Sequence, residues 1–255
     1  VPETHKITST NDLTKHFKES SEWVLKPEFS RFGTQVKIHP TLNEARGFDI
    51  SQAKPWALQR FLKGEQFATW AIFREGVMTV YSGYAITHRA GIGSSIWFSP
   101  HEDEALKSCV AKLGAALKWN GQLAFDFIVP QNGSPHVLEC NPRLTSGVHL
   151  FRDQPKMIDA MFEPVNPPFV PSPKTPAQLT VPMILYGLPH AIADKKLGSW
   201  LKGIWTGRDV IFNWRDLKPS LFQFVSIMVV LITAVRHRID LLSATTIDIE
   251  WNGET

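Results

Sequence analysis

Short runs of apolar residues, separated by polar and turn-forming residues, occupy the first part of the chain and predict β-strands. Strands are expected at residues 22–27, 36–38, 56–61, 67–73 and 78–84, with a flexible connection at 43–54. A turn at Glu75 and Gly76 would join the last two strands into a hairpin. This part of the chain is therefore predicted to be largely antiparallel sheet.

Two helices are predicted from capping residues and from apolar residues at helical spacing. The first begins after a cap at Ser9 and continues to about Glu19. The second begins after Ser99, where Pro100 and Glu102 suit the first turn. Its apolar positions are Leu106, Val110, Leu113 and Leu117.

Residues 121–143 are predicted to form a hairpin with two acids on one face. Asn132-Gly133 is a strong turn signal, and pairing symmetric about it places Asp126 opposite Glu139, with Asn141 on the same face. Two carboxylates about 5 Å apart repel by roughly 3 kcal/mol at an effective dielectric of 20. Mg²⁺ or Mn²⁺ would offset this repulsion, because hard cations bind carboxylate and amide oxygens. A solvated hairpin with incidental acids is the alternative, although both strands are otherwise strongly apolar and indicate a buried sheet.

The second part of the chain differs in composition. Residues 163–178 contain six prolines, which indicate either a linker or a wrapped, extended segment. Residues 221–235 are the most apolar run and lie between Lys218 and Arg236. A membrane span needs about twenty residues, so this run is predicted to be a buried helix. The ending at 245–253 alternates as a strand does.

Composition excludes several classes of protein. The 255 residues are 43% hydrophobic and 20% charged, a globular balance with length for one large domain or two small ones. The net charge of +3 is not concentrated in basic runs, so nucleic acid is not expected as a partner. Two cysteines cannot make a disulfide framework, and the N-terminus has no signal-peptide core. A cytoplasmic setting is therefore expected.

Four motifs in the order WVLKP, QRFLKGEQF, FDF and LECNPR resemble the ATP-grasp superfamily of ATP-dependent ligases. FSRFGT, FDFI, LECNPRLTSGVHLF and the ending TTIDIEWNG are most similar to its carbamoyl-phosphate-synthase-like branch. The resemblance extends over essentially the whole chain and implies an α+β fold in which two subdomains clamp ATP. The implied parts are a small subdomain (1–62), a large subdomain with the metal site (63–163), a proline-rich linker (164–178) and a partly helical C-terminal extension (179–255).

The resemblance implies nucleotide contacts along the first sixty-six residues. Lys26 would hold the α- and β-phosphates, with a solvated strand-end lysine as the alternative. The loop after it has few glycines and would offer Ser30 and Arg31 instead. Adenine would bond to the Arg60 carbonyl and the Leu62 amide. The remaining implied contacts are Gln59, Phe61 and, for the ribose, either Glu65 or Gln66.

The metal and the reacting groups are implied in the same way. Asp126, Glu139 and Asn141 fall where the superfamily binds magnesium ions. Arg143 falls where an arginine steadies the transferred phosphoryl group, with a structural ion pair as the alternative. The candidates for contact with an anionic substrate are Ser146, Gly147, His88 and Arg89, and for the last two a surface loop is an equal alternative.

The implied activity is a carboxylate–amine ligase that uses Mg-ATP. It would phosphorylate a carboxylate, and an amine, or secondarily a thiol, would attack the acyl-phosphate. The rival hypothesis is a non-catalytic nucleotide-binding or scaffold module, favoured by the phosphate loop's single glycine and disfavoured by the intact metal trio. Relatives usually carry a further N-terminal domain with substrate contacts, which we do not find before Val1. A membrane is not expected as a partner, and oligomer formation is left open.

Overall fold

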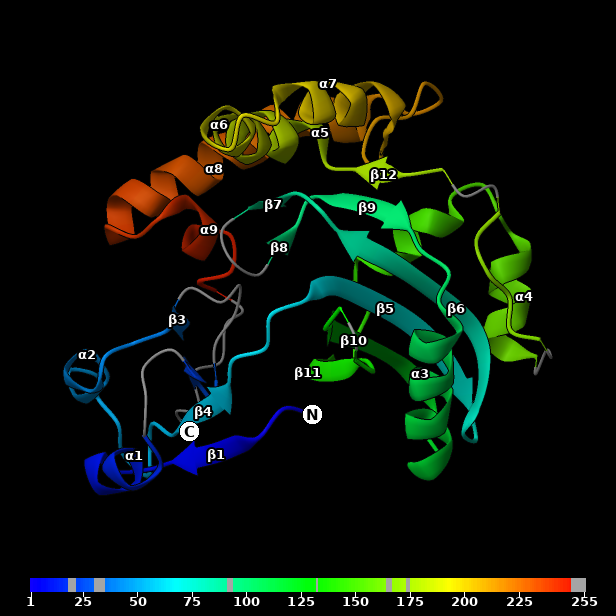
Figure 1. Cartoon of the computed structure of the whole chain (residues 1–255). Helices are drawn as coiled ribbons and strands as arrows, with labels where there is room; N and C mark the ends of the chain where they lie inside the picture. The colour runs from blue at the N-terminus through cyan, green and yellow to red at the C-terminus, as the bar shows by residue number, and fades with distance from the viewer. Residues whose placement is uncertain are drawn as a thin grey trace. The chain divides into compact units, whose positions relative to one another are not determined.

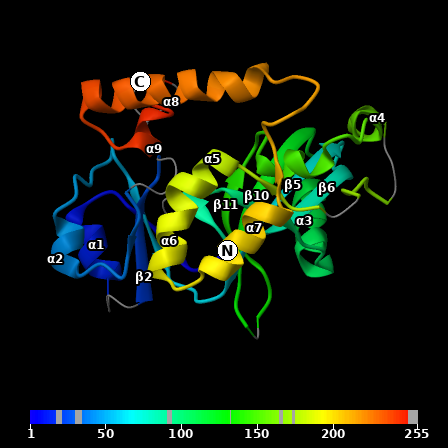
Figure 2. The same cartoon turned by 90° about the horizontal axis from the view of Figure 1, so that it is seen from above.

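The computed structural model describes residues 1–17, 22–29, 35–90, 94–131, 133–163, 167–172 and 175–248. They form two compact units. The small unit comprises the described residues of 2–61 and 211–248 together with Ala90 and Ser94. The large unit comprises Val1 and the described residues of 62–89 and 95–210. Figures 1 and 2 show the elements of both units.

The small unit is built on a four-stranded antiparallel sheet in the order β1-β4-β2-β3. Its strands are β1 (Thr4–Ile7), β2 (Trp23–Pro27), β3 (Lys37–Ile38) and β4 (Trp56–Arg60). One face packs against helices α1 (Thr10–His16) and α2 (Leu42–Arg46). The core between them consists of Ile7, Leu13, Trp23, Leu25, Ala45, Trp56 and Leu58. Alternation along the strands leaves the opposite face to Thr4, Lys26 and Gln59.

Both helices of the small unit begin at side-chain caps. Ser9 Oγ accepts a hydrogen bond from the Asp12 amide at 3.1 Å, which confirms the predicted start of α1. The segment predicted to be a flexible connection contains α2, so that prediction is wrong. A capping box between Thr41 and Glu44 satisfies the free amides of its first turn. At five residues α2 is too short to show helical periodicity in the sequence.

The large unit is built on a seven-stranded sheet in the order β11-β10-β5-β6-β9-β12-β13. Its central strands β5 (Glu65–Arg74) and β6 (Val77–Ile86) are joined at Glu75 and Gly76, which both adopt positive φ, so the predicted turn is confirmed. The other strands are β9 (Trp97–Pro100), β10 (Gly121–Val129), β11 (His136–Asn141), β12 (Ala177–Gln178) and β13 (Arg208–Asp209). The short strands β7 (Arg89–Ala90) and β8 (Ser94–Ser95) pair separately.

Helices cover both faces of this sheet, which explains why its central strands are apolar throughout (Figure 1). On one face α3 (Glu104–Ala116) packs Leu106 and Val110 against Phe67, Phe73 and Phe125. The other face is covered by η2 (Ser146–Phe151) and α4 (Lys156–Phe162). The buried residues of this second core are Trp70, Ile72, Val80, Ala124, Phe151 and Ala160.

Helix α3 begins later than the sequence predicts. Residues 97–100 continue the sheet as β9, so Ser99 is a strand residue and not a cap. Asp103 caps the helix instead, and its Oδ1 accepts hydrogen bonds from the amides of Ala105 at 2.7 Å and Leu106 at 3.1 Å. The helix is confirmed, and its first turn is displaced because strand pairing competes for the same residues.

The proline-rich segment is not a linker in its described part. The Phe169 amide donates to the Thr79 carbonyl at 2.8 Å, and the Tyr81 amide donates to the Phe169 carbonyl at 3.0 Å. Ala177 and Gln178 form β12, which pairs with β9. The alternative of a wrapped, extended segment therefore fits. The proposed division at 163 and 178 differs from the structure, in which this segment and residues 179–210 belong to the large unit.

The C-terminal part is helical, as predicted, but its most apolar helix is not buried. In the large unit, α5 (Thr180–Pro182), η3 (Met183–Gly187) and α6 (Leu188–Ala193) run into one another and precede α7 (Leu197–Thr206). In the small unit, α8 (Lys218–His237) precedes α9 (Leu241–Ala244). Phe224 of α8 is 73% exposed, so the prediction of a buried helix is wrong. Thr245 to Asp248 form turns and not the predicted strand, and the rest of that segment lies outside the described residues.

Candidate functional site

One row of side chains crosses four strands of the large sheet. Glu139 on β11 pairs with Asp126 on β10, Asp126 pairs with Ala68 on β5, and Ala68 pairs with Tyr84 on β6. All four lie on the face covered by η2, because Ala68 and Tyr84 share a core with Leu150. Within this row Ala68, whose side chain is a methyl group, is the only residue between Asp126 and Tyr84. The arrangement places two acids and a phenol on one surface.

The predicted pairing of Asp126 with Glu139 is confirmed, but the turn that motivated it is different. Strand β10 ends at Val129 and β11 begins at His136, so the connection is longer than a two-residue turn. Pro130 and Pro135 lie in that connection, and proline has no amide for the ladder. A bulge at Leu138 then shifts the register, because Phe127 pairs with Val137. The predicted register therefore holds for Asp126 with Glu139 and for Ala124 with Asn141, but not for Phe127.

The electrostatic environment of Asp126 raises its pKa to about 6. Burial is the largest cause and the charge of Glu139 is the second, while Arg143 and Arg89 lower the pKa of Asp126. Glu139 itself is exposed because β11 is the edge strand of the sheet, so the prediction that both acids lie on a buried sheet holds for Asp126 alone. One like charge, from Glu139, and two arginines thus act on the half-buried carboxyl group of Asp126.

The donor atoms at this place suit a hard divalent cation. Asn141 pairs with Ala124 and lies on the same face as Glu139, so two carboxylates and one amide oxygen are presented together. Among the described residues no cluster of three or more His, Cys, Asp or Glu side chains is placed to hold a metal ion. A magnesium site here would therefore depend on the amide oxygen of Asn141 as its third side-chain donor.

Tyr84 is a site residue that the motifs do not indicate. Its side chain is buried, and burial together with the charge of Asp126 raises the pKa of the phenol. A side-chain hydrogen bond with Ser146 and the charge of Arg143 act in the opposite direction on this pKa. Tyr84 therefore links the acidic pair to the start of η2. The signal that could have found it is strand register, since it stands beside Ala68 in the row of Asp126.

Gly147 allows η2 to approach the sheet closely. A Cβ atom at Gly147 would lie 2.6 Å from both Ser82 Oγ and Trp70 Cβ. Ser82 Oγ also donates a hydrogen bond to the Gly147 carbonyl at 3.1 Å. Ser146 and Gly147, both predicted from the sequence, thus lie at the contact between η2 and the sheet. Gly147 serves this contact through its backbone.

The structure separates the basic candidates. Arg89 and Arg143 both act on the pKa of Asp126, and Arg143 Nη2 donates to Asn141 Oδ1 at 3.3 Å. His88 has different neighbours, because its ring lies edge-on to Trp97 with centroids 6.3 Å apart. Burial and the charge of Lys196 lower the pKa of His88. Arg89 therefore joins the acidic pair, whereas His88 packs near β9 and the C-terminal helices of the large unit.

In the small unit Lys26 is part of a hydrogen-bonded chain on the open face of the sheet. Lys26 Nζ donates to Gln59 Oε1 at 3.1 Å, and Gln59 Nε2 donates to Thr4 Oγ1 at 2.9 Å. Gln59 is buried, so its amide is fixed by these two contacts. The ammonium of Lys26 is therefore held at the end of β2 and is not a freely solvated side chain. Ser30 and Arg31 lie outside the described residues.

The segment that follows β4 leads from the small unit into the large unit. The Phe61 amide donates to the Glu22 carbonyl at 2.6 Å, and the Arg60 guanidinium lies 3.1 Å from Glu22 Oε2. Among the described residues the Leu62 amide has no hydrogen-bond partner, as the predicted adenine contact requires. Gln66 has the same orientation on β5 as Ala68, whereas Glu65 points to the opposite face. Gln66 therefore shares the face of Asp126.

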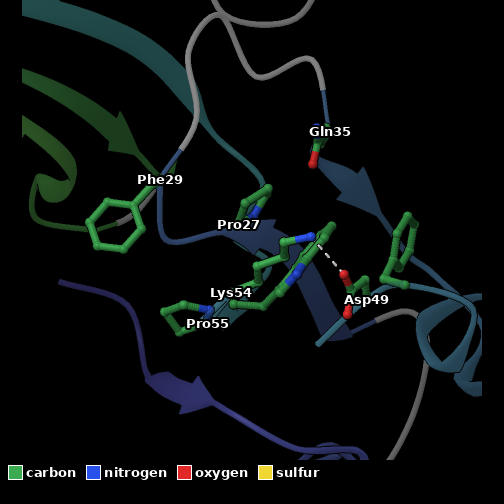
Figure 3. A pocket seen from close by; sticks show the side chains of 8 residues that line it. Pro27, Phe29, Gln35, Asp49, Lys54 and Pro55 are labelled. Carbon is green, nitrogen blue, oxygen red and sulfur yellow. Dashed lines mark hydrogen bonds and ion pairs between the residues drawn. The ribbon is translucent and has the colours of Figure 1, made fainter. Parts of the chain in front are cut away.

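A cavity of about 330 Å³ lies in the small unit beyond the end of β2 (Figure 3). Pro27, the residue after Lys26, contributes to its wall together with Phe29 and Gln35. At its edge Lys54 Nζ lies 2.8 Å from Asp49 Oδ2. Sequence motifs contain no sign of this cavity, because its lining comes from three separate segments of the chain. Pro27 and Gln35 in its wall flank the predicted phosphate loop.

Comparison with known proteins identifies the family. The profile of the ATP-grasp domain family matches residues 1–147, which is more than half of the chain, so the chain belongs to this family. A search of curated proteins found no significant match. The predicted family and the α+β fold class with C-terminal helices are confirmed.

Several solved structures are similar to this chain, and the first of the following three has a TM-score above 0.5. Phosphoribosylamine–glycine ligase from Thermotoga maritima is 16% identical with a TM-score of 0.51, over 69% of this chain and 53% of that one. An N5-carboxyaminoimidazole ribonucleotide synthetase bound to ADP is 16% identical with a TM-score of 0.48, over 60% and 43%. An L-amino acid ligase from Bacillus licheniformis is 18% identical with a TM-score of 0.41, over 58% and 40%. The chain spans about half the length of these proteins, or less.

Proposed function

We propose that this ATP-grasp domain belongs to an ATP-dependent ligase that joins a carboxylate to an amine. The observation that carries the proposal is the opposed pair Asp126 and Glu139, with Asn141 on the same face and two arginines acting on Asp126. A structural ion pair would place one acid against one base. A half-buried acid whose pKa is raised by an adjacent acid is typical of a site that binds a cation.

We infer that residues of this chain bind Mg-ATP. Lys26 would contact the phosphates, and its bond to Gln59 would hold the ammonium in place before the nucleotide binds. Asp126, Glu139 and Asn141 would hold Mg²⁺, which neutralises phosphate charge when bound. Adenine would use the Arg60 carbonyl and the Leu62 amide. Gln66 is the better candidate for the ribose than Glu65, because it shares the face of Asp126.

The reaction would proceed through an acyl-phosphate. A carboxylate oxygen of the substrate attacks the γ-phosphorus of ATP and ADP leaves, and the amine then attacks the acyl carbon while phosphate leaves. Arg143 and Arg89 would orient the anionic groups, since guanidinium can donate two parallel hydrogen bonds to a carboxylate or phosphate. Positioning and charge neutralisation would supply most of the rate.

The test measures ADP release from Mg-ATP against a panel of carboxylates and amines. Wild-type protein is expected to release ADP with at least one pair, and Asp126→Asn is expected to lose this activity. Asp159→Asn, an exposed acid on α4, is the matched control and should keep it. Full turnover by Asp126→Asn would refute the metal assignment. Thermal protection by Mg-ATP without turnover on the whole panel would favour the rival, a non-catalytic nucleotide-binding module.

A further inference from the structure

Helix α8 exposes apolar side chains to a degree that is unusual for a globular protein. Between Lys218 and Arg236 its sequence contains no charged residue. Val235 is 79% exposed and Ile232 is 62% exposed. The other large apolar side chains exposed on this helix are Leu221, Phe222, Phe224, Val225, Met228, Val229 and Leu231. Contiguous exposed apolar surface of this kind indicates a binding surface.

A helix that packs on the core of a soluble protein has an apolar buried face and a polar exposed face, and α8 has the reverse. Its least exposed positions recur every three or four residues and are Ser220, Gln223, Ile227, Val230, Thr233 and Ala234. This inner stripe contains the polar side chains Ser220, Gln223 and Thr233. The outer side is the apolar one. Such a helix buries its mixed face against the protein and leaves its apolar face for another environment.

The ends of α8 favour lipid as that environment. Arg215 and Lys218 precede the apolar run, and Arg236 and Arg238 follow it. Basic residues at both ends match the anionic headgroups of a bilayer, and long side chains can reach those headgroups while the run between them lies deeper. Trp214 is 82% exposed just before the helix, and tryptophan concentrates at the membrane interface. A protein groove would not require basic residues at both ends of an uncharged helix.

The segment after α8 restricts how this helix could contact a lipid bilayer. The chain turns at Arg238, which adopts a left-handed conformation, and continues into α9. Ala244 and Thr246 are buried, and α9 packs back against α8. With Asp240 and Ser243 of this turn folded back beside α8, crossing a bilayer would carry their polar side chains into hydrocarbon unless α9 detached from α8. It can lie in the plane of the membrane.

We propose that α8 is an in-plane membrane anchor whose apolar outer face inserts into one leaflet of a lipid bilayer. The large unit has a similar feature of its own. The continuous helical stretch from Thr180 to Ala193 is apolar, and Ile184, Leu185 and Ile192 on it are exposed. Trp205 on α7 is 90% exposed. Each of these exposed apolar helices therefore resembles the amphipathic helices that hold proteins at a membrane.

Flotation of the full chain with preformed vesicles containing anionic lipid tests the proposal. Wild-type protein is expected to float with the vesicles, and to do so also in about 0.5 M salt, which screens charge but not apolar insertion. Met228→Glu with Ile232→Glu places two charges on the inserted face and should reduce partition by roughly a hundredfold. Both replaced side chains are exposed, so circular dichroism and thermal unfolding should be unchanged.

The matched control carries the same charge change elsewhere. Leu117→Glu with Ile158→Glu replaces apolar side chains that are 61% and 54% exposed on the large unit, and it should float as the wild type does. Absence of wild-type flotation would overturn the proposal. So would wild-type protein that is a dispersed oligomer without affinity for vesicles and becomes monomeric in the α8 variant, because a second copy would then cover the helix.

Discussion

Asp126 and Glu139 lie directly opposite each other on β10 and β11, and both carry negative charge when ionised. Burial and this neighbour together raise the pKa of Asp126 to about 6, while Arg89 and Arg143 only partly oppose the shift. The metal-free fold therefore holds the proton of Asp126 more tightly than water holds that of an ordinary aspartate. A bound cation, or replacement of one of the two acids by a neutral residue, would relieve the repulsion between Asp126 and Glu139.

The first prediction concerns stability and pH in the absence of divalent metal. The folded protein holds the Asp126 proton more tightly than the unfolded chain, in which the pKa is about 4. The contribution of this group is thus complete below pH 4 and is lost as the pH rises through 6. The loss is at most about 3 kcal/mol for a shift of about two units. Denaturant unfolding between pH 4 and 7.5 should show this loss in the wild type but not in Asp126→Asn.

The second prediction is that Mg²⁺ stabilises the wild type at neutral pH and that this effect needs both acids. A hard cation bound to the two carboxylates replaces their repulsion by attraction. Asp126→Asn and Glu139→Gln should each lose most of the rise in Tm caused by Mg²⁺, measured by thermal unfolding with and without EDTA. Asp159→Asn should retain the rise. Equal stabilisation of all four proteins would mean that the ion binds elsewhere.

Sequence patterns predicted the parts of the site that depend on local order. The two acids of the hairpin follow from spacing, whereas Lys26 at the end of β2 and Gly147 were implied by the family resemblance. The opposition of Asp126 and Glu139 was predicted from strands joined directly by a two-residue turn, whereas β10 ends at Val129 and β11 begins at His136. The opposition holds because the bulge at Leu138 lies nearer the connection than the acids do. The contact between the two acids was predicted correctly, although the two strands do not extend to a two-residue turn as the prediction assumed.

Tyr84 could not be placed from the sequence for a related reason. The turn at Glu75 and Gly76 predicts a register that pairs Ala68 with Gly83, and the structure follows it only as far as Phe73 with Met78. A bulge then inserts one residue, so Ile72 pairs with Val80 and Ala68 pairs with Tyr84. Because a shift of one residue turns every side chain to the other face, the sequence does not reveal which residues join Asp126.

The exposure of α8 was also beyond what the sequence could indicate. An apolar run of fifteen residues has the same pattern whether it is enclosed by protein or faces lipid. The helix itself extends over twenty residues, because Lys218 to Ser220 and Arg236 to His237 continue it at both ends. Burial depends on what packs around an element, and that information lies in the tertiary structure.

The third prediction tests Lys26. Lys26→Ala should abolish the rise in Tm caused by Mg-ATP, since an ammonium at the end of β2 would oppose phosphate charge directly. The unliganded protein should change by about 1 kcal/mol, because the hydrogen bond to Gln59 that this variant loses is only half-buried. Lys37→Ala, an exposed lysine on the edge strand β3, is the matched control and should keep the ATP effect. A Lys26→Ala protein that ATP stabilises as strongly as the wild type would rule out the phosphate contact.

The last prediction tests the close contact between η2 and the sheet. Gly147→Ala places a methyl group 2.6 Å from Trp70 Cβ and Ser82 Oγ, so η2 must move away and strain or cavities must result. We expect a loss of about 1–3 kcal/mol in the free energy of unfolding, measured in denaturant. The site should suffer as well, because Ser146 precedes Gly147 and shares a hydrogen bond with Tyr84.

Gly198→Ala is the matched control for this last prediction. It lies in α7, and nothing within 4 Å of its position would meet a new Cβ atom. Alanine is a better helix former than glycine, so this variant should gain up to about 1 kcal/mol. The two substitutions add the same methyl group and should change stability in opposite directions. If Gly147→Ala were as stable as the wild type and kept its response to Mg-ATP, the approach of η2 to β5 and β6 would not position the site.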